Sequence, residues 1–597
     1  MKSPAEAPIS RSHLPADRAW RGAVTGLITA AVALGVGQLV AGLIGPQFSP
    51  VATVGAAAID QTPAPVKNFA IAEFGSHDKT VLVGGILVML AVFAAAIGIA
   101  AVRRLAWGLA GLTLFTVVAL AAALTRPTVT AAAVLPALAG GAAGVLALVA
   151  MVRAADKVTA PDAAGRAAAS SPVPPGSDKT QPSPGPGPQA ANTLEGESTR
   201  TSPLAGAGAA KASGAGPADS ADAPGANWVP PGPRTPAPSP VEPGRRSFLV
   251  VSSLAIGAAG VTGLAGRALA ERTSVARAQA SLRLPRPSET VPPVPAGADL
   301  HIPGLSSFIT PASSFYRVDT ALVLPQVAPE SWTLRIHGMV EREMTLTFQD
   351  LLHRPLIEDY VTLCCVSNPV GGPYIGNAKW LGPSLAGVLR EAGIRAGAQQ
   401  LLCTSVDGFT SGTPVQTVMD GRDALLAVAM NGHALPVAHG FPVRLVVPGL
   451  YGYVSACKWV TDIEVTRWAD AQGYWVPRGW SQQAPIKTES RIDVPSLASN
   501  SPKAGRTPVA GVAWAQHKGV DAVEVRVDSG PWHQAQLASV PGIDTWRQWV
   551  WYWDATPGSH TIEARATDAT GYTQTALQVP PEPNGASGYP AVTVTVQ

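Results

Sequence analysis

The chain has 597 residues, with 43 Lys and Arg against 40 Asp and Glu, so its formal net charge is +3. This near-neutral balance disfavours a nucleic-acid binder that relies on bulk positive charge. Charged residues make up 14% of the chain and hydrophobic residues 47%, whereas an average soluble protein has roughly 25% charged residues. A single compact soluble domain is therefore excluded, and the composition predicts a multi-domain chain with at least one part in a lipid bilayer.

Five charge-free apolar segments are each long enough for a transmembrane helix, which needs about 20 residues. These segments are 22–45, 80–102, 105–125, 127–152 and 247–266. The first four predict a four-helix transmembrane region over residues 1–153, and the last predicts a fifth transmembrane helix over residues 245–267. The first four segments contain no histidine, so a haem held by two histidines inside the helices is not expected.

Clusters of basic residues predict the orientation of these helices, because short loops rich in Lys and Arg stay in the cytoplasm. The four clusters next to the segments are Arg11, Arg18 and Arg21; Arg103 and Arg104; Arg153 and Lys157; and Arg245 and Arg246. All four indicate the same topology, with the N-terminus in the cytoplasm. A multi-pass protein of the cell membrane is predicted, with everything after residue 267 on the extracytoplasmic side.

Residues 154–244 are dominated by Ala, Pro, Gly, Ser and Thr. Such a segment cannot bury enough apolar surface to offset its chain entropy, which predicts a disordered cytoplasmic tether. Directly after it, Arg245 and Arg246 precede an apolar run, a pattern that resembles a twin-arginine export signal in an internal position. Two ordinary cytoplasmic arginines explain the same pair, and the sequence leaves both interpretations open.

The remainder of the chain has the pattern of globular domains. Strand-forming residues in 332–337 and 442–448, with helical periodicity in 348–352 and 384–392, predict an α+β domain over residues 285–470. Beyond it, short strands separated by turn residues predict an immunoglobulin-like β-sandwich over residues 485–597. The expected strands of this sandwich are 509–514, 522–527, 546–553, 560–566 and 591–596.

The chain has four cysteines, Cys364, Cys365, Cys403 and Cys457, whose spacings match neither a zinc site nor a haem-attachment motif. A disulfide between Cys403 and Cys457 is one option on the extracytoplasmic side. The vicinal pair is more informative, because it joins a hydrophobic strand to a Gly-rich turn. A soft thiolate on a tight turn suits a transition metal, although a cysteine at a strand end is by itself more often an inert core residue.

The segment around Cys365 resembles the cysteine motif of the sulfite oxidase family of molybdopterin enzymes, in which Leu-x-Cys-x-x-Asn supplies the protein ligand to molybdenum. Residues 363–368 fit this motif, with Cys365 in the ligand position. Residues 430–449 resemble the family signature that ends in His-Gly-Phe-Pro-Val-Arg, and Lys458 lies where the family closes its pterin site. The family's immunoglobulin-like C-terminal domain, which often mediates dimers, has its likeness in residues 511–514 and 549–558.

The resemblance implies a molybdenum–molybdopterin cofactor, with Cys365 as the catalytic metal ligand. It also implies that Arg444 and Lys458 hold the phosphate end of the cofactor. The charge of Arg444 supports this role, because an unpaired cation in an apolar strand is costly and a buried anion would compensate it. The other cofactor-binding residues that the resemblance implies are His439, at the pterin, the backbone groups of Ala456 and Cys457, and Tyr316, Arg317 and Asp319 of the first cofactor loop.

Two departures from the family pattern concern the substrate. Sulfite oxidases follow the motif asparagine with an arginine, whereas Asn368 is followed by Pro369, and the family's active-site tyrosine is matched by Phe409. An anion clamp and a hydroxyl are both missing from their expected places, which makes sulfite itself doubtful as substrate. The basic residues that could supply a positive charge from elsewhere are Lys379, Arg422 and Arg478.

The sequence therefore predicts a membrane-anchored molybdopterin-dependent oxidoreductase that transfers an oxo group to or from a small extracytoplasmic substrate. No haem or flavin motif accompanies the site, so an external one-electron redox partner is expected, and a homodimer through the C-terminal domain is an option. Two alternatives remain open at this point. One is a sulfoxide reductase of the cell envelope, and the other is a non-catalytic scaffold or adhesion protein with a degenerate molybdenum site.

Overall fold

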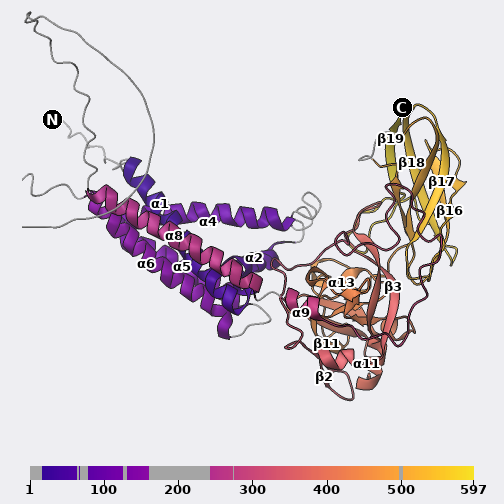
Figure 1. The fold of residues 1–597 in the computed structure, drawn as a ribbon, viewed down its shortest axis with the longest axis horizontal. Helices are drawn as coiled ribbons and strands as arrows, with labels where there is room; N and C mark the ends of the chain where they lie inside the picture. Colours follow the sequence, from indigo (N-terminus) through magenta and orange to yellow (C-terminus); the bar gives the residue numbers. More distant parts are fainter. Residues whose placement is uncertain are drawn as a thin grey trace, which may run out of the picture. The chain divides into compact units, whose positions relative to one another are not determined.

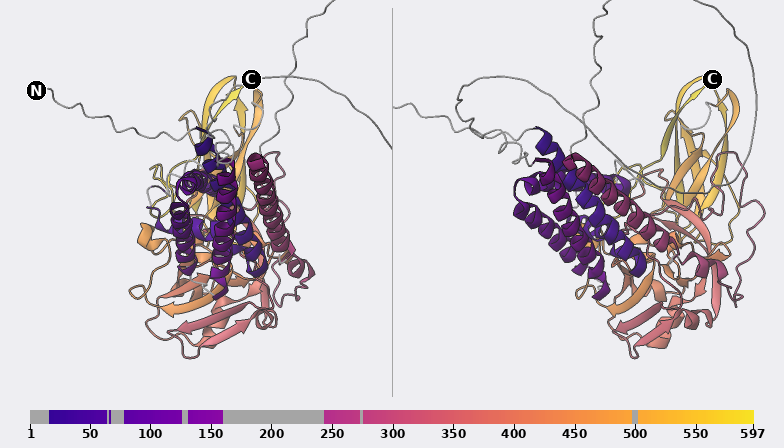
Figure 2. Two further views of the ribbon diagram at one scale, coloured as in Figure 1. Left: turned by 90° about the vertical axis from the view of Figure 1, so that its left-hand side faces the viewer. Right: turned by 60° about the vertical axis from the view of Figure 1, so that its left-hand side comes forward.

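The structure is a computed structural model, and Figures 1 and 2 show its ribbon. The residues that it describes are 16–63, 66, 78–125, 131–159, 243–272, 275–496 and 502–597. Most of the predicted tether, residues 160–242, lies outside the described residues, so the disorder expected there stays a prediction.

Five helices in the described ranges are long and apolar enough to cross a membrane. They are α1 (Ala16–Ile44), α4 (Asp78–Arg103), α5 (Leu105–Leu124), α6 (Leu135–Thr159) and α8 (Pro243–Arg272). Each overlaps one predicted segment, and the largest shift is in α6, which begins eight residues later than expected because a short 3-10 helix (Ala131–Val134) precedes it. The sequence pattern missed helix α2 (Pro50–Gln61), whose N-cap Ser49 accepts a hydrogen bond from the Ala52 amide.

Helices α1 and α4 cross at backbone contact. A Cβ atom added to Gly26 would lie 1.8 Å from the Ala94 carbonyl oxygen, and one added to Gly98 would lie 2.1 Å from that of Gly22. Only glycine permits this approach, which is the usual way for helices to pack closely in lipid, where the hydrophobic effect does not drive them together. Figure 2 shows the helices of this region lying side by side.

A five-stranded sheet, in the order β2–β1–β11–β5–β6, forms one layer of the α+β region. Its strands are β1 (Thr333–Gly338), β2 (Met344–Thr347), β5 (Gln400–Ser405), β6 (Thr410–Pro414) and β11 (Val460–Thr466). Strands β1 and β11 are parallel, with Arg335 opposite Asp462, so segments far apart in the sequence become neighbours. The helices here are α9 (Ala276–Ser281), α10 (Phe348–Leu352), α11 (Leu385–Ala392), α12 (Val415–Met419) and α13 (Gly452–Ser455).

A second sheet has the order β3–β4–β8–β9, and β7 pairs with β10 beside it. Its strands and the adjoining pair are β3 (Leu356–Cys364), β4 (Ile375–Pro383), β7 (Leu425–Ala427), β8 (Ala429–Met430), β9 (His433–Ala434) and β10 (Arg444–Val446). The strand expected over 442–448 is reduced to β10, because Pro442 and Pro448 lack the amide hydrogen that a ladder requires. Strand β3 delivers Cys365 to the turn before β4.

Tryptophan side chains anchor the core of this region. Trp332, Trp380 and Trp459 are each at most 2% exposed. A buried indole needs a partner for its N–H, and these three donate to the backbone carbonyls of Val460, Val361 and Val437 respectively. The bulky rings therefore tie together strands and loops that are distant in the sequence.

The C-terminal region is rich in β structure and consists of two four-stranded antiparallel sheets. The first contains β12 (Glu489–Val494), β13 (Gly505–Trp514), β17 (Arg547–Ala555) and β16 (Gln536–Leu537). The second contains β15 (His533–Gln534), β14 (Val520–Val527), β18 (Gly558–Asp568) and β19 (Ala591–Val596). Inward-facing residues of both sheets, among them Val509, Val523 and Ile562, share one apolar core. All five predicted strands are present, most of them longer than expected.

Glu489 of β12 is a buried carboxyl group, because its side chain is only 3% exposed. Burial raises the pKa of Glu489 to about 8 from an ordinary value of 4.5, and the charge of Lys487 opposes the rise. The folded state therefore holds a proton that the unfolded chain releases, so this group's stabilisation is full below pH 4.5 and is lost as the pH rises through 8.

We expect the melting temperature of the wild-type protein to fall between pH 4.5 and pH 8 more steeply than that of Glu489→Gln, whose amide keeps the shape without titrating. Melting curves across this range measure the difference. The matched control is Glu343→Gln, at a side chain that is 61% exposed, and it should leave the pH profile unchanged. Parallel profiles for wild type and Glu489→Gln would contradict the expectation.

Candidate active site

One cavity collects almost all of the residues that the sequence predicts for the cofactor site. They come to it from the segment before β1, from the β3–β4 turn, from the 3-10 helix Val437–His439, from β10 and from the residues after α13. The predicted residues that line it are Tyr316, Arg317, Asp319, Cys365, His439, Arg444, Ala456 and Lys458.

Cys457 is the one predicted residue that does not line this cavity. Its thiol is directed to the Cys403 carbonyl oxygen at 3.9 Å, and its own carbonyl accepts a hydrogen bond from the Leu445 amide at 2.9 Å. Both sulfur atoms are free thiols, as are those of Cys364 and Cys365, so the disulfide considered between Cys403 and Cys457 is absent. Cys457 therefore belongs to the support of β10.

A network of backbone contacts shapes the turn that carries Cys365. The Cys365 amide donates to the Tyr374 carbonyl at 2.9 Å, and the Asn368 amide donates to the Cys365 carbonyl at 3.1 Å. The Asn368 side-chain oxygen closes the loop by accepting from the Tyr374 amide at 2.8 Å. A Cβ on Gly372 would lie 2.6 Å from that oxygen, so both the motif asparagine and this glycine are required by the turn.

The two vicinal cysteines face different surroundings. Cys364 is completely buried in the apolar core, whereas Cys365 lines the cavity and is 8% exposed. Burial raises the pKa of the Cys365 thiol, and hydrogen bonds from the amide and hydroxyl of Ser367 oppose this rise. Donors aimed at the sulfur favour its thiolate form, which is the form that binds metals. Sequence reasoning did not identify Ser367, because its role depends on the turn geometry.

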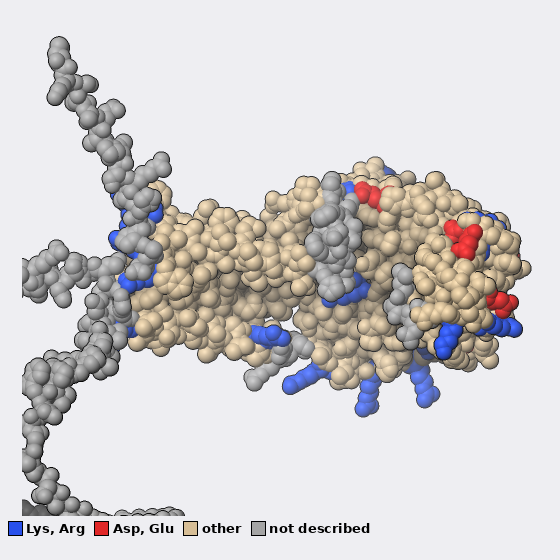
Figure 3. Space-filling model, turned by 90° about the horizontal axis from the view of Figure 1, so that it is seen from above, with Lys and Arg blue, Asp and Glu red and all other residues tan. Residues whose placement is uncertain are grey.

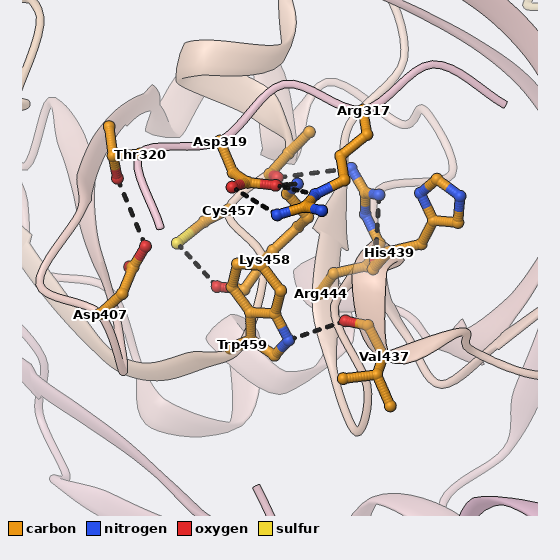
Figure 4. A network of polar contacts seen from close by, with 11 residues as sticks. Arg317, Asp319, Thr320, Asp407, Val437, His439, Arg444, Cys457, Lys458 and Trp459 are labelled. Atoms are coloured by element: carbon orange, nitrogen blue, oxygen red, sulfur yellow. Dashed lines mark hydrogen bonds and ion pairs between the residues drawn. The ribbon is translucent and has the colours of Figure 1, made fainter. Parts of the chain in front are cut away.

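Figure 4 shows a compact group of charged side chains, which includes Arg317, Asp319 and Lys458. The Asp319 carboxylate accepts from Lys458 Nζ at 2.8 Å and from Arg317 Nε at 2.7 Å. Burial lowers the pKa of Lys458 to about 8, and the charge of Asp319 opposes the shift. Asp319 thus compensates Arg317 and Lys458, two of the cations that the resemblance assigns to the cofactor.

Arg444 is a buried cation without such compensation, with its side chain only 5% exposed. Its guanidinium donates to the carbonyl oxygens of His439 at 3.1 Å and Ala456 at 3.4 Å, and lies 5.0 Å from the centroid of the Trp380 ring. Burial lowers its pKa to about 10. Within the described ranges no carboxylate forms an ion pair with it, and a buried cation of this kind requires an anion. A phosphate group entering the cavity would meet that need, so the residues present fit the family's cofactor.

His439 lies beside Arg444 as a neutral ring, because burial and the neighbouring Arg444 charge lower its pKa to about 4. Its Nε2 is 2.9 Å from the Ala312 carbonyl oxygen. A carbonyl can only accept, so we assign the proton to Nε2, which leaves Nδ1 as an acceptor. The ring stands edge-on to Phe315 at 5.5 Å, and its fixed orientation suits recognition of a heterocyclic N–H.

The basic residues considered as substitutes for an anion clamp lie elsewhere. Lys379 pairs with Glu358 at 2.6 Å, and Arg422 pairs with Asp420 at 2.6 Å. The Arg478 guanidinium stacks on the Tyr474 ring at 3.7 Å. None of the three lines the Cys365 cavity itself. Arg478 lines a neighbouring pocket that shares Asp407 and Phe409 with this cavity, so a substrate cation from outside the cavity stays a prediction. Glu358 lies on the strand paired with that of Lys379, whereas Asp420 and Tyr474 are close in sequence to their partners. The cavity lining instead includes residues that sequence reasoning gave no role, namely Tyr374, Asp407, Tyr453, Trp475 and Trp480.

Comparison with known proteins agrees with this geometry. A family model described as "Oxidoreductase molybdopterin binding domain" matches residues 321–475, which include Cys365, His439, Arg444 and Lys458. The chain belongs to the sulfite oxidase family of molybdopterin-dependent oxidoreductases. The cofactor that this family implies is molybdopterin carrying molybdenum.

Among individual relatives, the chain is 31% identical to sulfite oxidase of Gallus gallus over 298 residues, covering 42% of this chain and 63% of that enzyme. It is 28% identical to sulfite oxidase of Arabidopsis thaliana over 329 residues, covering 45% and 83%. It is 32% identical to YuiH, an uncharacterized oxidoreductase of Bacillus subtilis, over 149 residues, covering 25% and 72%. The chain thus spans less than two thirds of the Gallus gallus enzyme. A crystal structure of the sulfane dehydrogenase SoxCD from Paracoccus pantotrophus aligns at 23% identity and a TM-score of 0.43, covering 48% of this chain and 83% of that one.

Proposed function

We propose that this chain is a membrane-anchored oxidoreductase that transfers an oxo group to or from a small extracytoplasmic substrate at molybdenum. The observation that carries the proposal is one cavity lined both by the Cys365 thiol and by the uncompensated, buried Arg444. These are the two groups that a cofactor with a soft metal and a phosphate would need. When bound, the cofactor supplies two-electron oxo-transfer chemistry that no side chain here can provide.

The residues of the chain would hold and orient this cofactor. Cys365 would bind the metal, and the Ser367 hydrogen bonds would favour its thiolate form. Arg444 and Lys458 would bind the phosphate. The ion pair with Asp319 would hold the Lys458 side chain in position for this contact. His439 Nδ1 would accept from the pterin.

Molybdenum and pterin analysis of the purified chain tests the proposal. We expect about one molybdenum and one molybdopterin for each chain, together with oxo-transfer activity. A chain that repeatedly purifies free of both, from a host that loads other molybdopterin enzymes, would contradict the proposal. That result would favour the scaffold or adhesion alternative.

The arrangement of the helices supports membrane anchoring, with the four basic clusters on the cytoplasmic side. Arg18 Nη2 donates to the Val102 carbonyl at 3.3 Å, next to Arg103, and Ser252 lies beside Met151, with Oγ 3.9 Å from Sδ. The start of α1 therefore lies near the end of α4, and the N-terminal half of α8 packs beside the C-terminal half of α6. Figure 3 shows most of the Lys and Arg of the helical surface gathered at one end of it. This distribution favours the topology that the basic clusters predict.

Protease treatment of intact cells tests this topology. Residues after 267 should be accessible from outside, whereas the 154–244 tether should be protected, because it lies in the cytoplasm in the proposed arrangement. Epitope tags placed in the tether and at the C-terminus report cleavage of the two regions separately. Permeabilised cells, in which the protease reaches the tether, are the control. Cleavage in the tether of intact cells, with the C-terminal part spared, would contradict the model.

Four further expectations complete the proposal. The domain division at 285–470 and 485–597 remains our assignment, and the two facing sheets of the C-terminal region favour an immunoglobulin-like sandwich there. Electrons would pass to an external one-electron partner. Dimerisation through the C-terminal region is proposed from the family resemblance, and the twin-arginine-like pair would direct export of a folded domain.

A further inference from the structure

Aromatic rings line the cavity that contains Cys365. Phe409, Tyr453, Trp475 and Trp480, which we call the aromatic wall, all belong to its lining. The rings of Tyr453 and Trp480 are 6.1 Å apart and those of Trp475 and Trp480 are 6.2 Å apart. Tyr474 connects Trp475 at 5.2 Å to Phe409 at 5.8 Å. These spacings lie in the range of favourable ring contacts, so the wall is a continuous packed surface.

The charges in the cavity leave little attraction for an anionic substrate. The charged residues of its lining are the cations Arg317, Arg444 and Lys458 and the carboxylates Asp319 and Asp407, which sum to 3 − 2 = +1. A phosphate monoester carries about −1.5 to −2 charges near pH 7. The cofactor's phosphate would therefore more than neutralise the lining.

Asp407 adds a carboxylate close to the aromatic wall, two residues before Phe409. Its Oδ1 accepts from the Phe409 amide at 3.2 Å, and its Oδ2 accepts from the Thr320 hydroxyl at 3.3 Å. These two neutral donors, of which Figure 4 shows Thr320, orient the carboxylate without cancelling its charge. An anion entering the cavity would be repelled by it, by an amount that grows as water is excluded.

We infer that the substrate is an uncharged organic oxo donor or acceptor whose apolar group packs on the aromatic wall, and that Asp407 disfavours anions such as sulfite. The inference rests on the proposed function and names its substrate class. Sulfur compounds suit this surface because aromatic rings contact both apolar groups and sulfur favourably. For a sulfoxide, the S–O bond breaks, sulfur gains two electrons and the oxygen leaves as water with two protons. A one-electron donor supplies the electrons in two steps, and a thioether would undergo the reverse reaction with a one-electron acceptor.

The test uses the full chain in detergent, after its molybdenum content has been measured. Three substrates are compared: methyl phenyl sulfoxide with reduced viologen, methyl phenyl sulfide with ferricyanide, and sulfite with ferricyanide. We expect at least one aryl compound to exceed sulfite in kcat/KM by roughly 100-fold, as a difference of about 3 kcal/mol would give. A chain without molybdenum overturns the proposed function. A molybdenum-loaded chain that prefers sulfite, or that turns over neither aryl compound, overturns this inference alone.

Substitutions at two positions test the residues named. Trp475→Ala should raise KM for methyl phenyl sulfoxide roughly tenfold, with a smaller rise for dimethyl sulfoxide, because only the phenyl group needs the ring. Trp475→Phe should restore most of the affinity. Asp407→Asn keeps the hydrogen-bonding shape, and should lower the inhibition constant of sulfite roughly tenfold.

The controls are Tyr552→Ala and Asp554→Asn, at two exposed positions of β17, and both should leave these constants unchanged. An Asp407→Asn variant with an unaltered sulfite constant would overturn the role of Asp407. Equal effects of Trp475→Ala on the aryl and dimethyl compounds would overturn the role of the aromatic wall.

Discussion

Cys365→Ser is expected to abolish oxo transfer while leaving the fold intact. Serine approximates the shape of cysteine but lacks the soft sulfur donor that a metal of this kind requires. Changes to groups that merely support a metal ligand often cost about 10- to 100-fold, so loss of the ligand itself should exceed that range. The measurements are activity, molybdenum content and thermal unfolding of wild type and variant. Full activity in Cys365→Ser would show that the metal is held elsewhere.

Cys364→Ser is the matched control, because it makes the same substitution at the preceding residue, the last one of β3. Cys364 faces the core and its thiol is directed to the Cys365 carbonyl oxygen at 3.5 Å. A serine hydroxyl can donate to the same oxygen, so we expect a stability loss of about 1–3 kcal/mol at most and activity near wild type. Equal loss of activity in both variants would mean that the ligand is misassigned.

Arg444→Ala is expected to weaken cofactor retention far more than it alters turnover by the cofactor that remains. The guanidinium is buried, and in the described part of the chain its hydrogen-bond partners are all carbonyl oxygens, so its charge is available to a phosphate. Charge-assisted hydrogen bonds contribute about 1.5–3 kcal/mol each, and losing them corresponds to at least roughly tenfold weaker binding. The rate of oxo transfer per bound molybdenum should be nearly unchanged.

Molybdenum content measured alongside rate per molybdenum checks this expectation. Arg444→Lys should retain more cofactor than Arg444→Ala, because it keeps the charge but loses the fork of donors. Arg390→Ala, at an exposed position of α11, should change neither quantity. Full occupancy with a collapsed rate in Arg444→Ala would instead assign Arg444 to the substrate.

Local patterns in the sequence determined the elements whose formation depends on their own residues. The long helices follow from uninterrupted apolar segments, since a helix in lipid must satisfy its backbone internally. Short elements with strong local signals were also predictable: α10 has a capping box between Thr347 and Asp350, and α11 begins after Ser384, which caps it. Cys365 could be identified from its motif because the turn that presents it is built from consecutive residues.

Only the tertiary structure decided which side chains meet across long stretches of sequence. Lys458 and Asp319 are 139 residues apart, yet they form an ion pair that depends on where β11 and the segment before β1 are placed. The aromatic wall likewise combines Phe409 with Trp475 and Trp480, and no spacing rule connects them. Periodicity specifies which face of an element is buried, but the partner across that face is set by the packing of the whole fold.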